Sequence, residues 1–100
     1  MSKLAFFARF EAKPGKENEV AAFLETARQM AAKEPTTIHW YAIRMSPSTF
    51  GVFDTFDDEA GRQKHLNGPI GQALMAKAPE LFSSPPSIEP VDVLGSKIAA

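Results

Sequence analysis

Two histidines are the side chains of this chain whose charge changes most readily near neutral pH. His65 lies near the end of a short helical pattern, where an imidazole could accept a proton from a phenol or stabilise an enolate. The alternative is structural, because a histidine in the last turn of a helix is favoured by the helix dipole and can donate to a backbone carbonyl. We keep both interpretations of His65.

Large polar and aromatic side chains are concentrated on one predicted strand. Alternation puts His39 and Tyr41 on one face of that strand and Trp40 and Arg44 on the other. Aromatic rings with a polar atom could stack on a planar ligand while donating a hydrogen bond, and a guanidinium could stabilise a phenolate. The alternative is that these side chains fill the core of a dimer. The candidate substrate-binding residues are Trp40, Tyr41, Arg44 and Phe56, and His39 is a catalytic candidate.

Asp54 interrupts an otherwise apolar strand between Phe53 and Phe56. A buried carboxylate needs a charged or hydrogen-bonded partner. Asp54 is therefore a candidate general base, or one half of a structural ion pair with Arg44 or Arg9 across the sheet.

Several kinds of chemistry lack the residues that they require. Cysteine is absent, which excludes disulfides and thiolate catalysis. The two histidines fall on different elements without a metal-binding spacing, so no metal site is expected. Gly68 and Gly71 flank Pro69 at a helix start and form no nucleotide-binding loop. We expect a protein without a cofactor.

The bulk composition fits one globular domain over residues 1–100, with 44% apolar residues, 23% charged residues and a net charge of −1. The scattered basic residues argue against a nucleic-acid partner. No apolar run approaches the roughly 20 residues that span a bilayer, and the first ten residues do not resemble a signal peptide. The expected location is cytoplasmic, with no membrane partner.

The first half of the chain predicts a strand, a helix and a hairpin. Residues 3–12 predict a strand, and Pro14-Gly15 predicts a turn. Apolar residues at helical spacing predict a helix over 16–33, which Pro35 ends. Residues 37–45 and 49–56 are rich in β-branched and aromatic residues and lie either side of a short turn, which predicts an antiparallel hairpin.

The second half predicts two helices and a last strand. The first helix is capped by Asp57 or Asp58 and ends near Leu66. The second begins at Pro69, and Pro79 breaks or kinks it near its end. Residues 87–94 predict a strand in which Pro90 requires an edge position or a bulge. The predicted order β-α-β-β-α-α-β indicates an α+β, ferredoxin-like fold, with helices on one face of a four-stranded antiparallel sheet.

The strands carry large apolar residues on both faces, although helices can cover only one. Phe6 and Phe7 are neighbours and therefore point to opposite faces, as do Trp40 and Tyr41. A second copy of the same sheet is the simplest cover for the other face, which predicts a homodimer. A monomer with an exposed aromatic patch is the alternative.

The chain resembles the antibiotic biosynthesis monooxygenase family, in the dimeric α/β-barrel superfamily. The resemblance lies in residues 8–17 (ARFEAKPGKE), in residues 53–60 (FDTFDDEA) and in His65-Leu66 before a further helix. The resemblance implies a dimeric α/β barrel and a pocket between sheet and helices in each subunit. It also implies oxidation of phenolic or quinol-like aromatics by molecular oxygen without a cofactor, and a histidine at the end of the short helix.

The haem-degrading branch of that family carries an asparagine, a tryptophan and a histidine at three positions where this chain has Ala8, Phe56 and Leu74. We therefore do not expect haem.

The resemblance favours a cofactor-independent monooxygenase, an oxidoreductase, acting on a small aromatic or quinol-like substrate. A homodimer that binds a small ligand or serves a stress response without catalysis is the alternative. An enzyme requires at least one of His65, His39 and Asp54 in the pocket.

Overall fold

The predicted order of strands and helices is confirmed in a computed structural model that describes residues 3–99. The elements are β1 (Leu4–Glu11), α1 (Glu17–Ala31), β2 (His39–Arg44), β3 (Thr49–Phe56), α2 (Glu59–Leu66), α3 (Pro69–Leu81) and β4 (Ser87–Asp92). Over residues 3–99, each helix is too short or too polar to cross a bilayer.

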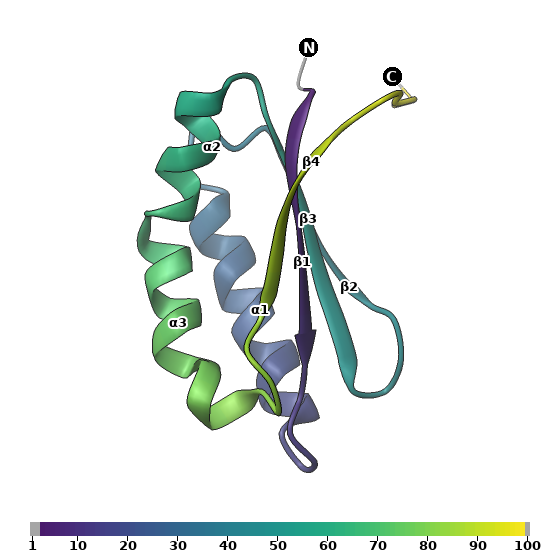
Figure 1. Cartoon of the computed structure of the whole chain (residues 1–100), viewed down its shortest axis with the longest axis vertical. Helices are drawn as coiled ribbons and strands as arrows, with labels where there is room; N and C mark the ends of the chain where they lie inside the picture. Colours follow the sequence, from purple (N-terminus) through teal and green to yellow (C-terminus); the bar gives the residue numbers. More distant parts are fainter. Residues whose placement is uncertain (1–2, 100) are drawn as a thin grey trace.

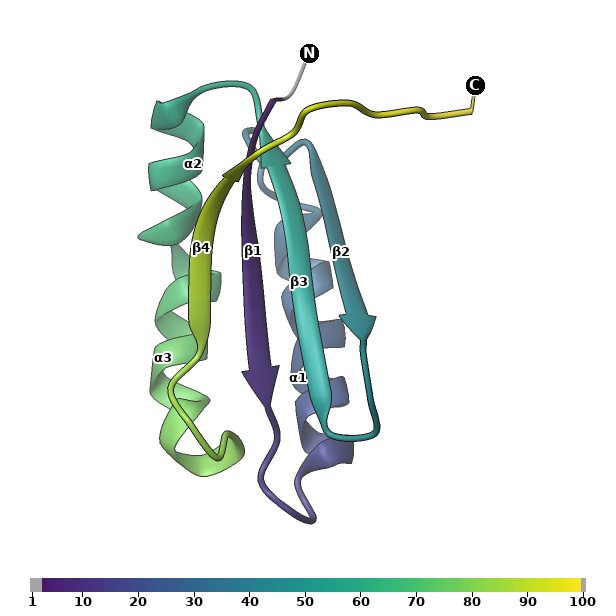
Figure 2. The ribbon, with the colours of Figure 1, turned by 45° about the vertical axis from the view of Figure 1, so that its right-hand side comes forward.

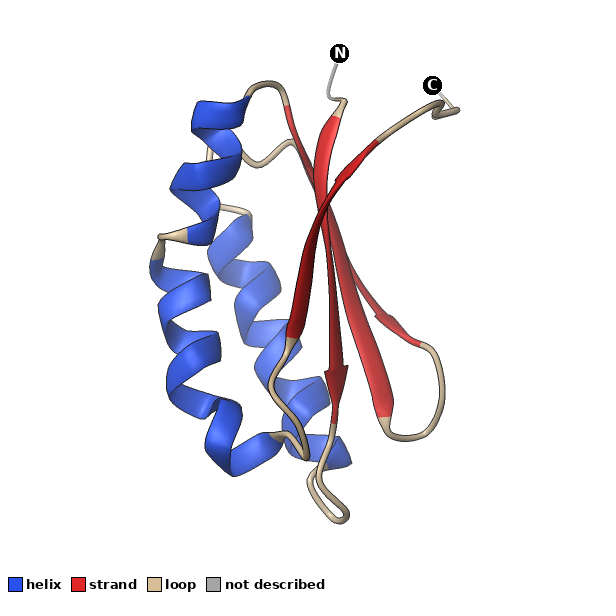
Figure 3. Ribbon diagram, in the orientation of Figure 1, coloured by secondary structure: helices blue, strands red, loops and turns tan. Residues whose placement is uncertain are grey.

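The four strands form one antiparallel sheet in the order β2-β3-β1-β4, and all three helices cover the same face of it (Figures 1 and 3). Pro90 lies in the edge strand β4, where a residue without an N–H is tolerated. The fold is the predicted α+β, ferredoxin-like arrangement. The sheet is open, so this chain does not close a barrel by itself, and a barrel built from two copies stays a prediction.

The helix boundaries follow from local chemistry. Of the two predicted caps, Asp58 is the one that caps α2, and its carboxylate accepts the backbone N–H of Gly61 at 2.8 Å. Pro69 occupies the start of α3 as predicted. Of the two effects predicted for Pro79, the break is wrong, because α3 continues through it to Leu81, and the kink stays a prediction. A proline in the last turn removes one backbone hydrogen bond and leaves the preceding turns intact.

The core lies between the sheet and the helices. Helix α1 contributes the stripe Val20, Leu24, Ala27 and Ala31, all of them buried, at the spacing that its sequence predicted. The other buried members are Ala8, Phe10, Ala12, Phe50, Val52, Ile70, Leu74, Leu81 and Phe82. Burial of these apolar side chains is the main force that fixes α1 and α3 against the sheet.

The other face of the sheet has no helix over it. Tyr41 and Ile43 of β2 point away from the helices and are 54% and 42% exposed. After β4, residues 93–99 leave the sheet and extend past its β2 side (Figure 2), and Leu94 is fully exposed there. Alternation correctly predicted that Trp40 and Tyr41 lie on opposite faces, and the structure shows that Trp40 is the one toward the helices.

Candidate functional site

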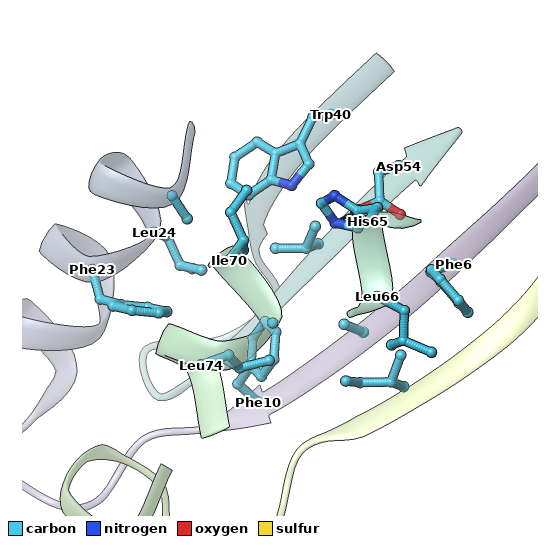
Figure 4. Close-up of a pocket in the computed structure, with 15 residues that line it drawn as sticks. Phe6, Phe10, Phe23, Leu24, Trp40, Asp54, His65, Leu66, Ile70 and Leu74 are labelled. Carbon is cyan, nitrogen blue, oxygen red and sulfur yellow. Dashed lines mark ion pairs between the residues drawn. The ribbon is translucent and has the colours of Figure 1, made fainter. Parts of the chain in front are cut away.

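A cavity of about 50 Å³ lies between the sheet and the helices. Its polar lining consists of Trp40 from β2, Asp54 from β3 and His65 from α2 (Figure 4). The remaining wall is apolar: Phe6, Ala8, Phe10, Phe23, Leu24, Ala27, Val52, Leu66, Ile70, Gly71, Leu74 and Ile88. A few polar groups in an apolar wall are typical of a small-molecule site.

Strand register brings Trp40 and Asp54 together. Trp40 pairs with Asp54 across β2 and β3, and Asp54 pairs with Phe6 across β3 and β1. Directly paired residues present their side chains on the same face, so all three point toward the helices. The isolated acid in an apolar strand therefore lies on the wall of the cavity and not on the outer face.

His65 is held between two carboxylates. Its Nε2 lies 2.9 Å from Oδ2 of Asp54, and its Nδ1 lies 2.6 Å from Oε1 of Glu34. The side chains are 9% exposed for His65, 3% for Asp54 and 20% for Glu34. Because a carboxylate only accepts hydrogen bonds, a ring that satisfies both partners must donate from both nitrogens, which is the imidazolium form.

The surroundings of His65 favour that charged form. Burial by itself lowers the pKa of the ring, since it penalises the charge. The hydrogen bonds to Asp54 and Glu34 and the charges of both carboxylates outweigh burial, so the pKa of His65 lies above its ordinary value.

Two buried polar atoms on the cavity wall have no hydrogen-bond partner within residues 3–99. They are the indole Nε1 of Trp40 and Oδ1 of Asp54, the carboxylate oxygen that does not contact His65. Figure 4 shows the indole nitrogen turned toward His65 and Asp54. An unpaired buried donor or acceptor costs about 1–3 kcal/mol. The open donor and the open acceptor could both bond to a polar group of a ligand.

Glu34 is the member of this cluster that the sequence did not reveal. It lies in the loop between α1 and β2, 31 positions from His65 in the chain. Thr37 Oγ1 donates to Oε1 of Glu34 at 2.7 Å and lies 3.3 Å from Nδ1 of His65. A polar residue before Pro35 is unremarkable as a pattern, so no sequence signal pointed to this contact.

The other candidates lie outside the cavity. His39 and Tyr41 are on the opposite face of the sheet, where their rings stack at 6.5 Å and His39 Nδ1 lies 3.0 Å from Thr55 Oγ1. Arg44 is at the far end of β2, with its guanidinium 4.8 Å from the centre of the Phe50 ring. The possible ion pair of Asp54 with Arg44 or Arg9 is therefore wrong, since Asp54 pairs with His65.

Phe56 is fully buried beside the site and is not part of the cavity wall. Its ring centre lies 5.3 Å from that of His65 and 5.9 Å from that of Phe6, so it packs behind the candidate catalytic group.

In residues 3–99, no three histidine or acidic side chains converge on a point that could hold a metal ion. His65 separates its two carboxylates by binding one at each nitrogen.

No protein-family model matches the chain, and no curated protein sequence matches it. Among solved structures, the NE2512 protein of unknown function from Nitrosomonas europaea is 57% identical over all of this chain and 97% of that chain, with a TM-score of 0.95. The chain belongs to the family of the NE2512 protein. This membership assigns no activity to it.

More distant structures share the fold of this NE2512-family chain. Rv0793 from Mycobacterium tuberculosis is 18% identical over 95% of this chain and 98% of that chain, with a TM-score of 0.83. A structure described as an antibiotic biosynthesis monooxygenase is 15% identical over 92% of this chain and 99% of that chain, with a TM-score of 0.78. The resemblance drawn from the sequence is thus confirmed in fold.

Proposed function

We propose that this NE2512-family protein is a cofactor-independent monooxygenase that binds a small phenolic or quinol-like molecule between its sheet and helices. The observation that carries the proposal is the pair of unpartnered buried atoms, Nε1 of Trp40 and Oδ1 of Asp54, on one apolar cavity. The shared fold with an antibiotic biosynthesis monooxygenase supports the reaction type.

A neutral hydroxyl group matches this pair of atoms. One hydroxyl can donate to Oδ1 of Asp54 and accept from the indole N–H of Trp40. A ketone would leave Asp54 unpaired, and a carboxylate would meet the negative charge of Asp54. The apolar wall around them favours an aromatic or aliphatic body for the ligand.

The proposed reaction begins with transfer of the phenolic proton to Oδ1 of Asp54. A ring carbon of the phenolate then adds molecular oxygen, and Asp54 returns the proton to the outer peroxide oxygen. Loss of water from the hydroperoxide leaves a quinone, so one oxygen atom enters the product and the other enters water. The substrate supplies all the electrons, and the protein supplies deprotonation and a dry site.

In this scheme the base is Asp54, and His65 assists it. Both nitrogens of His65 contact carboxylates, so neither has a lone pair to offer a substrate. The imidazolium instead lines the cavity as a positive charge and stabilises the phenolate. His39, Tyr41 and Arg44 have no part in the scheme because they lie away from the cavity.

The size of the cavity restricts the substrate. Its 50 Å³ is well below the roughly 300–1,000 Å³ of pockets for drug-sized ligands. Binding even one aromatic ring requires wall side chains to move, because a benzene-sized site occupies about 150 Å³. We therefore propose a single-ring substrate first.

We further propose that the protein is a homodimer whose two sheets face each other. Tyr41 and Ile43 of β2 are exposed apolar side chains on the uncovered face, and Ile38 lines a surface hollow together with Tyr41, Phe53 and Ile98. Apolar residues of the segment after β4, Leu94 and Ile98, are also exposed. Contiguous exposed apolar surface is typical of an interface.

A non-catalytic ligand-binding dimer is the second candidate. The observation that favours it is the engagement of both His65 nitrogens, which leaves Asp54 as the one titratable group of the cavity wall with an open atom. Such a module would bind the same hydroxyl compounds without consuming oxygen.

Trp40 is the only tryptophan of the chain, so its fluorescence reports on the cavity. We would titrate hydroquinone and its dimethyl ether, which lacks the donated hydrogen, and follow oxygen uptake above the rate without protein. Hydroquinone should quench Trp40, the ether should bind at least tenfold more weakly, and oxygen should be consumed. Asp54→Asn should cut turnover by roughly 10²- to 10⁴-fold.

Quenching without oxygen uptake would favour the binding module. The site itself would be disproved if neither compound, nor any other small phenol, changed the fluorescence of Trp40.

A further inference from the structure

We propose that Glu34 is a positioning residue of this site, which fixes the His65 ring against Asp54 and balances its charge while Asp54 carries the proton of the substrate. The inference rests on the proposed function and adds a residue from outside the cavity to it.

Glu34 is fixed in place, unlike the surface acids of this chain. Its carboxylate accepts from Thr37 Oγ1 at 2.7 Å, and its backbone carbonyl accepts from the Thr37 N–H at 3.3 Å. The side chain is 20% exposed, whereas those of Glu25 and Glu59 are 55% and 54% exposed. An acid held in this way can orient its partner, because little of its freedom remains to be lost when the bond forms.

The helix that carries His65 packs closely on the turn that carries Glu34. A side chain at Gly61 of α2 would meet the Cβ of Thr36 at 3.3 Å, so the absence of a side chain there lets the two segments approach. His65 therefore reaches Glu34 with a 2.6 Å contact. The distance between ring and carboxylate is set by backbone packing as well as by attraction.

His65 forms the wall between the cavity and a surface hollow. The hollow is lined by Lys33, Glu34, Pro35, Thr36, Lys64, His65, Asn67, Gly68, Pro69 and Gln72, and His65 is the one residue that it shares with the lining of the cavity. Asp54 thus approaches the ring from the cavity side and Glu34 from the solvent side. A change at Glu34 can alter the ring without touching a bound ligand.

The charges explain why a second carboxylate is useful. When Asp54 takes the phenolic proton it becomes neutral, and the imidazolium loses the negative charge of its inner partner. Glu34 then remains as the protein carboxylate in contact with the ring. Lys33 and Lys64 line the same hollow, on the solvent side of the ring.

Glu34 thereby keeps His65 positive at the step when the phenolate forms. The total charge of Asp54, His65, Glu34 and the substrate is unchanged by the transfer, because one proton moves between two of them. The raised pKa of His65, to which the hydrogen bond and charge of Glu34 contribute, agrees with this role.

The test follows the ring nitrogens of His65 by ¹⁵N NMR in the ligand-free protein as the pH is changed. In Glu34→Gln, the titration midpoint of His65 should fall toward that of an ordinary histidine, and the Nδ1 resonance should change most. The ring resonances of His39 are the internal control, because His39 lies on the opposite face of the sheet and the substitution should leave them unchanged. Glu25→Gln, at an exposed helix position, is the matched control variant and should leave the titration midpoint of His65 unchanged.

Glu34→Asp keeps the charge but draws it back by one methylene, and it should give an intermediate midpoint. Where hydroquinone is turned over, Glu34→Gln should lower turnover by roughly 10- to 100-fold, the range seen for residues that orient metal ligands, and should shift the pH profile with the NMR midpoint. An unchanged His65 titration in Glu34→Gln overturns the inference whether or not the protein consumes oxygen. Failure of the proposed function would instead appear as absent oxygen uptake by the wild type, with the NMR shift still present.

Discussion

Trp40 and Asp54 are directly paired across β2 and β3, and each presents one buried polar atom that has no partner in the described chain. The pairing gathers a donor and an acceptor at one place on an otherwise apolar wall. Since a donor and an acceptor so placed are complementary to one hydroxyl, the ladder register of two strands sets the chemistry of the site.

Removal of His65 should destabilise the fold. In His65→Leu, Oδ2 of Asp54 loses its partner while its side chain stays 3% exposed. Breaking a buried ion pair on one side costs about 3–5 kcal/mol, because a buried charge is left uncompensated. Urea unfolding at a fixed protein concentration measures this loss.

The control for that variant is His39→Leu, which removes one hydrogen bond to Thr55 on the outer face. Its cost should be about 0.5–1.5 kcal/mol. Adding Asp54→Leu to His65→Leu should restore part of the lost stability, because the stranded carboxylate is then gone. If His65→Leu and His39→Leu lowered the unfolding free energy equally, the Asp54–His65 ion pair would contribute no more than a single surface hydrogen bond.

The stability that His65 contributes should depend on pH. Its pKa in the folded protein is raised above the ordinary value of 6.5, so the folded state binds the proton more tightly than the unfolded chain does. The contribution is therefore fully present below about pH 6.5 and is lost as the pH rises through the folded pKa. The difference in unfolding free energy between wild type and His65→Leu should shrink over that interval, and a difference that grows with pH would contradict the expected sign.

Gly71→Ala should be destabilising, although alanine normally stabilises a helix. Gly71 lies in the first turn of α3 on the cavity wall, and a Cβ there would clash with the backbone carbonyl oxygen of Leu66. Backbone must shift to relieve this contact, at a cost of about 1–3 kcal/mol. Gly95→Ala meets nothing within 4 Å and should stay within about 0.5 kcal/mol of wild type, as thermal unfolding can show.

Tyr41→Glu should dissociate the proposed homodimer. Tyr41 is 54% exposed on the uncovered face of the sheet, so a charge there would be buried between two copies. Met75→Glu is the control, because Met75 is 61% exposed on helix α3, on the helix-covered side of the sheet. Sedimentation should give a dimer for wild type and Met75→Glu and a monomer for Tyr41→Glu; a folded wild-type monomer at micromolar concentration would refute the dimer.

Much of the fold was determined locally and could be predicted. Helical spacing placed Val20, Leu24 and Ala27 on the buried stripe of α1, and the proline in the last strand required an edge. Alternation along β2 assigned Trp40 and Tyr41 to opposite faces, and the isolated acid at Asp54 identified a functional candidate. These features depend on residues a few positions apart, which is why the sequence alone specified them.

The composition of the site was decided only by tertiary structure. Helices α1 and α3 cover one side of the sheet, and this decides which strand residues line the cavity. Trp40 and Asp54 lie on the covered face, and His39 and Tyr41 lie on the other. The partner of Asp54 proved to be His65 and not an arginine, because α2 docks over β3. Glu34 contacts His65 although the two residues are 31 positions apart in the sequence. Backbone packing and a hydrogen bond from Thr37 hold Glu34 there, and local spacing in the sequence predicts neither of these contacts.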